Sequence, residues 1–302
     1  MESALSSNPT ILDTLRAYSG LMKWRIVILL VFTTVTAMVV ASDGAPPASQ
    51  LLWTILAGTL AAGGASALNQ YIDRDMDALM MRTARRPIPS GRVAPVNALL
   101  FGMSLVAWAV LLFGVFVNWL AASLALVGAL YYVVLYTMIL KRNTVVNIVI
   151  GGGAGAIPVL VGWAAATGSL AVEAFILFAI VFYWTPPHSW ALAILVNKDY
   201  AAANVPMMPV ARGEEVTRWQ ILLYSIQLVL ITLMPALGLL IPGTDMLGWF
   251  YAVCAAALGA GLIYMSWILI KVADKPTARN TYKYSSMYLA FLFLAMIIDR
   301  LI

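Results

Sequence analysis

Three oxygen-bearing side chains recur at every fourth position near the end of an apolar run. Asn69, Asp73 and Asp77 are spaced i, i+4 and i+8, so on a continuous helix they project from one face, with about 5 to 6 Å between successive Cβ atoms. Carboxylate, amide and water oxygens suit Mg²⁺, which leaves several coordination positions to water and phosphate. This spacing predicts a metal site. The alternative is a solvated helix end whose acids pair with neighbouring arginines.

Arginine is concentrated directly after this acidic motif. Within 15 residues of Asp77 the chain contains Arg82, Arg85, Arg86 and Arg92. Guanidinium groups bind phosphate oxygens through two hydrogen bonds at once. Acids beside arginines therefore favour the joint binding of a metal and a polyphosphate, although the same residues could pair in a surface network.

A second set of charged residues lies far away in the sequence. Lys198 and Asp199 follow another apolar run, and Lys141 and Arg142 end an intervening one. If these runs end at one membrane face, the four side chains and the acidic motif line a common pocket. The excess of basic residues at cytoplasmic helix ends explains Lys141 and Arg142 equally well.

Two polar side chains stand inside apolar runs. Asn147 lies about one turn into its run, where an amide needs a partner. His188 lies about nine residues before Asn197, which places it about 13 Å deeper than that helix end. At this depth an ionisable group is a candidate for contact with a substrate's ring, metal or reacting group. The alternative is a neutral histidine bonded to a backbone carbonyl that Pro186 and Pro187 leave free.

Composition restricts the elements that can position these residues. Of 302 residues, 63% are apolar and 10% charged, with a mean hydropathy of +0.91, which excludes an ordinary soluble domain. The net charge of +5 belongs to membrane loops and does not indicate nucleic acid. One cysteine and one histidine exclude an internal disulfide, a thiolate metal cluster and a multi-histidine site.

Membrane-spanning helices must therefore carry the polar residues. Runs long enough to span a bilayer lie at about 24–41, 51–71, 96–117, 120–140, 145–166, 173–196, 219–241, 247–270 and 285–301. We expect an all-α integral membrane protein with about nine transmembrane helices in a single domain, 1–302. Residues 1–22 form a polar segment before a first helix that is not cleaved.

Basic residues predict the orientation of this bundle. On the map of spans, 17 of the 18 Lys and Arg residues fall on one side, and only Arg300 falls on the other. Short loops rich in Lys and Arg stay cytoplasmic. We therefore expect a cytoplasmic N-terminus and chemistry on that side. The loops at 42–50, 167–170 and 242–246 are expected to be simple outer connectors.

Two loops of about 22 residues on the basic side resemble each other. The first begins at Asp73 and carries Pro87–Gly91, and the second begins at Asp199 and carries Pro209–Gly213. Four predicted helices separate them. This indicates a weak internal repeat, in which helices 2–4 correspond to helices 6–8 and a binding site lies where the halves meet.

The sequence resembles the UbiA superfamily of intramembrane prenyltransferases, nine-helix enzymes with aspartate-rich motifs on helices 2 and 6 or the loops after them. Asn69, Asp73 and Asp77 match the first of these motifs. Within the superfamily the chain is similar to members that farnesylate haem. The specific stretches are DALMMRTARRPIPSG (77–91), LKRNTVVNIVIGGGAGAIP (140–158), TPPHSWALAI (185–194) and PMMPV (206–210).

This resemblance implies transfer of the farnesyl group of farnesyl diphosphate to the 2-vinyl group of haem B, with addition of water, giving haem O and pyrophosphate. It implies a bundle in the bacterial inner membrane with its active site facing the cytoplasm, and haem A synthase as a partner. The implied metal ligands for Mg²⁺ are Asn69, Asp73, Asp77 and Asp199. The implied diphosphate-binding residues are Arg82, Arg86, Lys141, Arg142 and Lys198. His188 and Asn147 would line the acceptor pocket, and the implied catalytic residues are Asp73, Asp77, Asp199 and His188.

Two positions depart from the family pattern, and two other functions stay open. Asp199 is followed by Ala203 where the second motif usually has another acid, and Ser189 stands where an aromatic residue is frequent. One alternative is prenyl transfer to another aromatic acceptor, such as a quinone or chlorophyll precursor, which the stretch around His188 disfavours. The other is transport of an anionic solute, which predicts broken or charged helices at mid-membrane in both halves.

Overall fold

Long apolar helices organise the chain. A computed structural model describes residues 10–42, 44–239 and 246–302, and within these ranges nine helices are long and apolar enough to cross a membrane, as the sequence predicts. No β-strand occurs in the same ranges. The helical elements are α1 (Ile11–Leu21), α2 (Trp24–Ala41), α3 (Ala48–Ile72), α4 (Arg74–Leu79), α5 (Pro95–Phe116), α6 (Trp119–Leu130), η1 (Tyr131–Leu140), α7 (Lys141–Asn143), α8 (Asn147–Gly151), α9 (Gly153–Thr167), α10 (Val172–Leu195), α11 (Asn197–Ala202), α12 (Met208–Leu233), η2 (Met234–Leu239), α13 (Trp249–Val272) and α14 (Lys275–Leu301).

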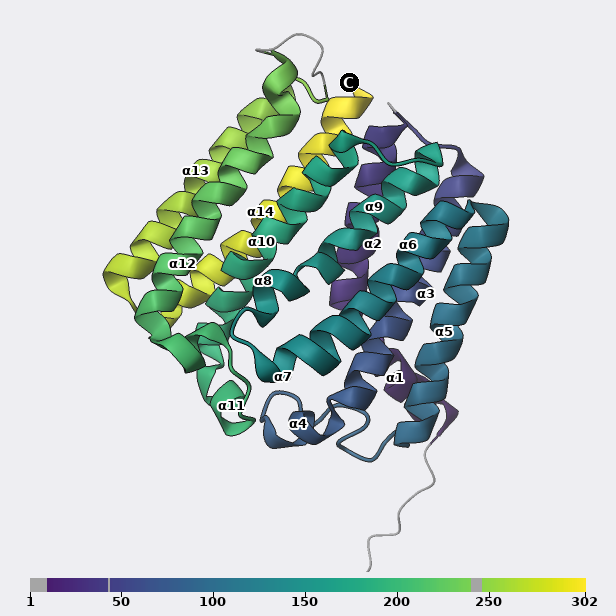
Figure 1. Cartoon of the computed structure of the whole chain (residues 1–302), viewed down its shortest axis with the longest axis vertical. Coiled ribbons are helices and arrows are strands. Elements are labelled where there is room, and N and C mark those ends of the chain that lie inside the picture. Colours follow the sequence, from purple (N-terminus) through teal and green to yellow (C-terminus); the bar gives the residue numbers. More distant parts are fainter. Residues whose placement is uncertain (1–9, 43, 240–245) are drawn as a thin grey trace, which may run out of the picture.

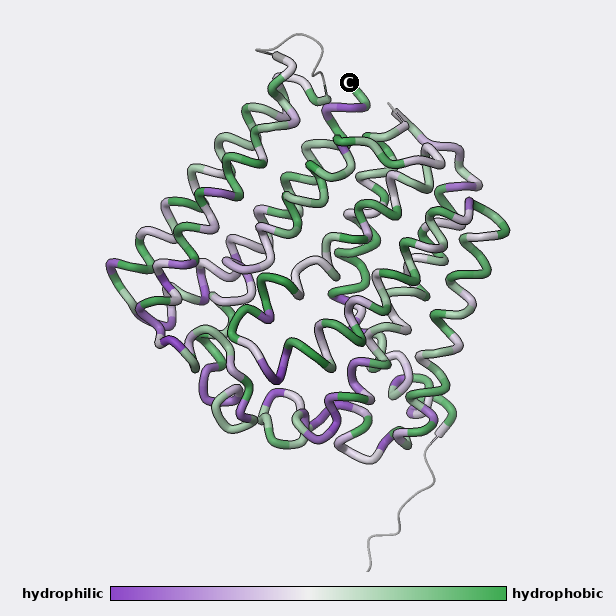
Figure 2. The backbone as a smooth tube through the Cα atoms, viewed as in Figure 1, coloured by the Kyte–Doolittle hydropathy of each residue, from purple (hydrophilic) through white to green (hydrophobic). Residues whose placement is uncertain are grey.

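One end of the bundle is polar. Figure 1 shows the long helices side by side, with α1, α4, α7 and α11 toward one end and the C-terminus at the other. Figure 2 shows that hydrophilic residues concentrate at the end that carries α4 and α11. This arrangement agrees with the predicted segregation of charge, while the cytoplasmic location of the polar end stays a prediction.

Helix α9 lies at the centre of the packing. Its buried side chains join one apolar cluster with α2, α10, α12, α13 and α14, and another with α3, α5 and α6. Gly162 permits the close approach of α9 to α2, because a Cβ at this position would collide with the backbone of Thr34. The two clusters leave the polar end to be organised by the short helices.

Helix ends differ most from the sequence prediction. Helix α14 begins at Lys275, ten residues before the predicted start at 285, because Asp274 caps it by accepting a hydrogen bond from the Thr277 amide at 2.8 Å. Arg279 and Lys283, predicted to lie in a loop, therefore extend a helix. Hydropathy marks the apolar turns of a helix and misses its polar turns.

The predicted span 219–241 also begins earlier. Helix α12 starts at Met208 and is interrupted at Gly213, whose φ of 83° and ψ of 161° are not helical. The end of this predicted span, most of the connector 242–246 and the first part of the polar segment 1–22 lie outside the described residues. The described part of that segment forms α1, which the sequence analysis did not predict.

The fourth span changes its helix type half-way along. At Tyr131 the α-helical α6 passes into the π-helix η1, which ends directly before Lys141. Such wider turns are uncommon and frequently occur at functional sites. Hydropathy does not distinguish this wider helix from an α-helix. After the spans α3 and α10, the short helices α4 and α11 each have six residues, as a repeat predicts.

Candidate active site

The acidic motif keeps its helical spacing past the end of α3. The Asp73 amide donates to the Asn69 carbonyl at 2.9 Å, and the Asp77 amide donates to the Asp73 carbonyl at 2.7 Å. The three side chains are buried, with at most 2% of each residue exposed. Asn69 Nδ2 donates to Asp73 Oδ2 at 2.8 Å. The structure thus brings Asn69 and Asp73 into contact, as their spacing predicts.

Each buried carboxylate of this motif has a basic partner. Lys141 Nζ donates to Asp73 Oδ2 at 2.5 Å, from the turn that follows η1. Arg86 Nη1 donates to both oxygens of Asp77, at 2.9 and 2.7 Å. Because these pairs are buried, removal of either partner would leave an uncompensated charge in the protein interior. The two basic side chains were among those predicted to hold a diphosphate.

Arg142 binds a third, more exposed acid. Its guanidinium donates to both oxygens of Asp75 at 2.8 Å and lies 3.8 Å from Asp73 Oδ1. The hydrogen bond from Arg142 lowers the pKa of Asp75 to about 2. The Asp75 side chain is 64% exposed, so this pair lies at the surface of the site.

Lys23 is a site residue that its sequence context did not indicate. It precedes α2 in a left-handed conformation, with φ of 53°, and its Nζ donates to Asn69 Oδ1 at 2.6 Å. Burial, together with the charges of Arg86 and Lys141, lowers the pKa of Lys23 to about 7. In the sequence Lys23 is one of many basic residues near helix ends, and only the tertiary fold shows its contact with a residue 46 positions away.

Contacts from α3 fix the segment before Lys23. Ser66 Oγ donates to the Leu21 carbonyl at 2.9 Å, and Gln70 Nε2 donates to the carbonyls of Gly20 and Leu21 at 3.2 and 2.9 Å. These bonds satisfy carbonyls that the end of α1 would leave free. The end of α1 is thereby held against the helix that carries Asn69.

The donor set around Asn69 and Asp73 fits a small divalent cation. The buried Asp73 Oδ1 accepts no hydrogen bond, and the ammonium groups of Lys23 and Lys141 lie against Asn69 Oδ1 and Asp73 Oδ2. Amide and carboxylate oxygens are hard donors of the kind that Mg²⁺ prefers. Within the described ranges no three His, Cys, Asp or Glu side chains form a complete metal cage. Phosphate and water oxygens would have to complete the coordination.

The second loop contributes fewer polar contacts to the site than the first loop does. Asp199 Oδ2 lies 4.0 Å from Arg82 Nε, and the Arg82 guanidinium also lies over the ring of Tyr200, 4.6 Å from its centroid. Lys198 is exposed and forms no ion pair in the part of the chain that the structure describes. The first and second loops thus meet through Arg82, although their sequences lie far apart.

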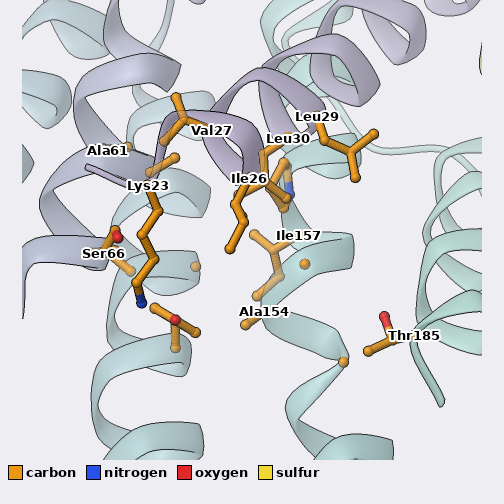
Figure 3. A pocket seen from close by; sticks show the side chains of 18 of the residues that line it. Lys23, Ile26, Val27, Leu29, Leu30, Ala61, Ser66, Ala154, Ile157 and Thr185 are labelled. Atoms are coloured by element: carbon orange, nitrogen blue, oxygen red, sulfur yellow. The ribbon is translucent and has the colours of Figure 1, made fainter. Parts of the chain in front are cut away.

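A cavity of about 430 Å³ extends from Lys23 into the apolar part of the bundle. Figure 3 shows Lys23 and Ser66 on one side of it and Thr185 on another, with apolar side chains from α2 and α9 between them. Asp73 and Asp77 do not line the cavity, whereas Lys23 lines it and contacts Asn69. Lys23 therefore links the charged cluster to the apolar chamber.

His188 lines the same cavity from α10. Its Nδ1 lies 2.9 Å from Ser285 Oγ of α14, and its ring stacks on Trp184 with centroids 4.3 Å apart. The alternative interpretation, a hydrogen bond to a carbonyl freed by the prolines, is wrong because the partner is Ser285. The helical assignment continues through Pro186 and Pro187.

Asn147 takes a different place from that of His188. It is fully buried at the start of α8, where its Nδ2 donates to the Thr144 carbonyl at 2.7 Å, and its Oδ1 accepts no hydrogen bond. The lining of the cavity includes Ser189 and the neighbouring Ile148 but not Asn147. A direct role for Asn147 in the acceptor pocket has no support from this geometry.

A helical membrane bundle with clustered acids and bases above an apolar cavity is an arrangement suited to handling a phosphorylated apolar molecule. The sequence matches the UbiA prenyltransferase family over residues 30–295, and the chain belongs to this family. Among its curated relatives are proteins named protoheme IX farnesyltransferase.

Two of these relatives illustrate the similarity. The protein from Roseiflexus sp. (strain RS-1) is 49% identical over 288 residues, which cover 95% of this chain but 53% of the relative. The protein from Gloeobacter violaceus is 48% identical over 303 residues and covers 100% of this chain and 97% of the relative. The chain thus spans about half the length of the first relative and nearly all of the second.

Solved structures share the fold. A digeranylgeranylglyceryl phosphate synthase superimposes with a TM-score of 0.76 at 19% identity, covering 95% of this chain and 99% of that chain. A UbiA homologue from Archaeoglobus fulgidus, bound to DMAPP and Mg²⁺, gives a TM-score of 0.64 at 14% identity, covering 93% and 99%. The UbiA-type helical bundle predicted from the sequence is confirmed, with nine candidate membrane spans in the described ranges.

Proposed function

We propose that this protein transfers the farnesyl group of farnesyl diphosphate to the 2-vinyl group of protohaem IX and adds water, giving haem O and pyrophosphate. The carrying observation is the continuity between two environments: Lys23 contacts the acidic motif and also lines the apolar cavity that His188 borders. A diphosphate and its prenyl chain need these two environments side by side. The relatives named protoheme IX farnesyltransferase support haem as the acceptor.

The proposed reaction balances without a redox partner. The bond between farnesyl C1 and the diphosphate oxygen breaks, and pyrophosphate leaves with the electron pair. The vinyl group supplies the electrons for a new carbon–carbon bond to farnesyl C1, which leaves a cation on the carbon attached to the porphyrin. Water captures this cation, and one proton is released. The apolar cavity delays hydrolysis of the farnesyl cation before transfer.

Basic side chains at the polar end have the position and charge to stabilise the departing pyrophosphate. Lys141 and Arg86 already lie beside acids of the motif, and Lys23 lines the cavity. Arg82 and Arg142 extend this positive surface, and the exposed Lys198 is available at its edge. Together they would hold the diphosphate with its prenyl chain directed into the bundle.

Asn69, Asp73 and Asp77 would hold the metal, with Asp199 facing it from the second loop. Bound Mg²⁺ would neutralise charge on the diphosphate and make it a better leaving group. The Mg²⁺ and DMAPP of the Archaeoglobus fulgidus homologue support a divalent ion for this chain. The acidic and basic side chains of the protein would hold the metal ion and the diphosphate in a fixed, buried arrangement.

His188 would contact the acceptor, by binding the haem iron or by a hydrogen bond. We expect His188→Ala to lower turnover with haem about 10- to 100-fold while farnesyl diphosphate still binds. Thr185→Ala is the matched control, because Thr185 lines the same cavity and its hydroxyl donates to its own helix, to the Val181 carbonyl at 2.9 Å. Equal kinetics of the two variants would remove His188 from the site.

The polar end would face the cytoplasm of a bacterium, with the bundle in the inner membrane as one domain. The distribution of basic residues supports this orientation. Haem O carries a farnesyl tail and would leave through the lipid phase, and the next enzyme to receive it would be a haem A synthase.

The decisive experiment uses the purified full chain in lipid nanodiscs with haem B, farnesyl diphosphate and Mg²⁺. Mass spectrometry should detect a porphyrin that has gained one farnesyl and one hydroxyl group, and EDTA should suppress it. A folded protein that binds farnesyl diphosphate but gives no such product would contradict haem as the acceptor. Quinone precursors would then be assayed in the same way.

A further inference from the structure

Three neighbours hold the ring of His188. It stacks on Trp184 with centroids 4.3 Å apart, and its centroid lies 4.7 Å from that of Tyr282. Its Nδ1 lies 2.9 Å from Ser285 Oγ. Two aromatic neighbours and one hydrogen bond therefore restrict the imidazole. The Nε2 edge has no hydrogen-bond partner among the described residues and is left to the cavity that the ring lines.

Ser285 is itself fixed by α14 and α10. The residue is fully buried, and its backbone carbonyl accepts a hydrogen bond from Trp184 Nε1 at 2.7 Å. Trp184 therefore joins the two helices at the level of His188. In such a dry environment a satisfied side-chain hydrogen bond is geometrically restrictive.

The hydroxyl of Ser285 has a local acceptor for its one proton. Ser285 Oγ lies 2.8 Å from the Tyr282 carbonyl oxygen, three residues earlier in the same helix. A helical serine that donates to such a carbonyl keeps its lone pairs for an incoming donor. The incoming donor is then Nδ1–H of His188, which leaves Nε2 as the unprotonated ring nitrogen.

We propose that Ser285 is a positioning residue that sets the tautomer of His188, holding the proton on Nδ1 and directing the Nε2 lone pair into the cavity. In this state Nε2 can bind a metal ion carried by the acceptor or accept a proton from it. A hydrogen bond at Nδ1 also fixes the ring orientation and raises the basicity of a metal-binding imidazole. This inference rests on the proposed function only for the identity of the acceptor as haem.

The chain contains a single histidine, so the tautomer can be measured without ambiguity. Protein labelled with ring-¹⁵N histidine, in nanodiscs without substrate, gives one pair of ring nitrogen signals. Long-range proton–nitrogen correlations assign them. We expect a protonated Nδ1 and an unprotonated Nε2 in the natural chain, and a shift toward a mixture of tautomers in Ser285→Ala.

Two further variants separate positioning from general packing. Ser285→Thr keeps the hydroxyl and should restore the natural pair of signals. Ser286→Ala is the matched control, because Ser286 Oγ lies 3.0 Å from the same Tyr282 carbonyl but has no contact with His188. A proton on Nε2 in the natural chain, or unchanged signals in Ser285→Ala, would overturn the proposal.

Haem binding then tests whether the tautomer of His188 affects how the acceptor binds. With ferrous haem B in nanodiscs, we expect Ser285→Ala to bind haem about tenfold more weakly and to lower the iron–histidine stretching frequency in resonance Raman spectra. Ser285→Thr should reverse both effects. If the nitrogen signals behave as expected but His188→Ala leaves the haem spectrum unchanged, the assignment of haem iron to His188 fails while the role of Ser285 stands.

Discussion

The first polar loop (residues 73–94) and the second (residues 197–207) each begin with a six-residue helix after a long span, but they arrange charge differently. In the first loop, Asp73 and Asp77 are buried, and their basic partners come from the same half of the chain. In the second loop, Asp199 is 17% exposed at its side chain, and its ion-pair partner is Arg82 of the first loop, at 4.0 Å.

The second loop contacts the first mainly through apolar side chains. Met76 of α4 and Met80, directly after α4, share a buried cluster with Val205 and Met207 of the second loop. The second loop therefore packs over the first. The comparison teaches that the first loop holds the buried ion pairs, whereas the second packs against it mainly through apolar side chains.

The largest effect should come from the first loop. Asp73→Asn keeps the shape of the side chain but removes the charge that pairs with Lys141 and that the proposed metal site would use. We expect turnover to fall about 10²- to 10³-fold. The assay is product formation by the purified variant in nanodiscs, with helical content checked by circular dichroism.

Asp75→Asn is the matched control for that variant. Asp75 lies two residues away and is also paired with a basic side chain, but it is 64% exposed. Exposed pairs contribute about 0 to 1 kcal/mol, so turnover should change by less than about fivefold. Similar losses in both variants would contradict a special role for the buried carboxylate.

A smaller effect is expected in the second loop. Asp199→Asn removes a single acid that lies beside Arg82, and we expect turnover to fall about tenfold. Glu215→Gln, an exposed acid on α12, serves as the control. If Asp199→Asn lowered turnover as much as Asp73→Asn, the acids of the two loops would be equally important. The difference between the loops would then be contradicted.

The smallest effect on turnover is expected from a backbone change in α12, the helix that follows the second loop. Gly213 interrupts α12 with a positive φ of 83°, and a side chain here would meet open space. Gly213→Ala should therefore act through backbone strain alone, about 1 to 3 kcal/mol. We expect faster proteolysis near α12 with little change in turnover. Gly155→Ala, which also meets open space but lies in the regular helix α9, should not increase proteolysis.

Hydropathy and charge predicted the spans well because these properties are local. Nine spans and a polar end follow from runs of apolar residues and from the placement of Lys and Arg. Asn69 and Asp73 were also predictable, since helical spacing alone makes them neighbours. The polar turns of α14 were missed because a hydrophobicity pattern does not record the cap at Asp274.

The missed site residues depend on contacts between distant segments. Lys23 reaches Asn69 across 46 positions, and Ser285 reaches His188 across 97. A serine in an apolar helix and a lysine at a helix end are common, so neither is distinctive in the sequence. For Asn147 the structure shows a bond to the nearby Thr144 carbonyl, and its place in the acceptor pocket stays a prediction.

The number of residues in the π-helix η1 determines where the basic side chains after it lie. It spans Tyr131–Leu140 and delivers Lys141 to Asp73 and Arg142 to Asp75. A single-residue deletion in this stretch would change the register of both basic side chains relative to α3. Insertions and deletions should therefore be excluded from this stretch in evolution, while the outer connectors can vary in length.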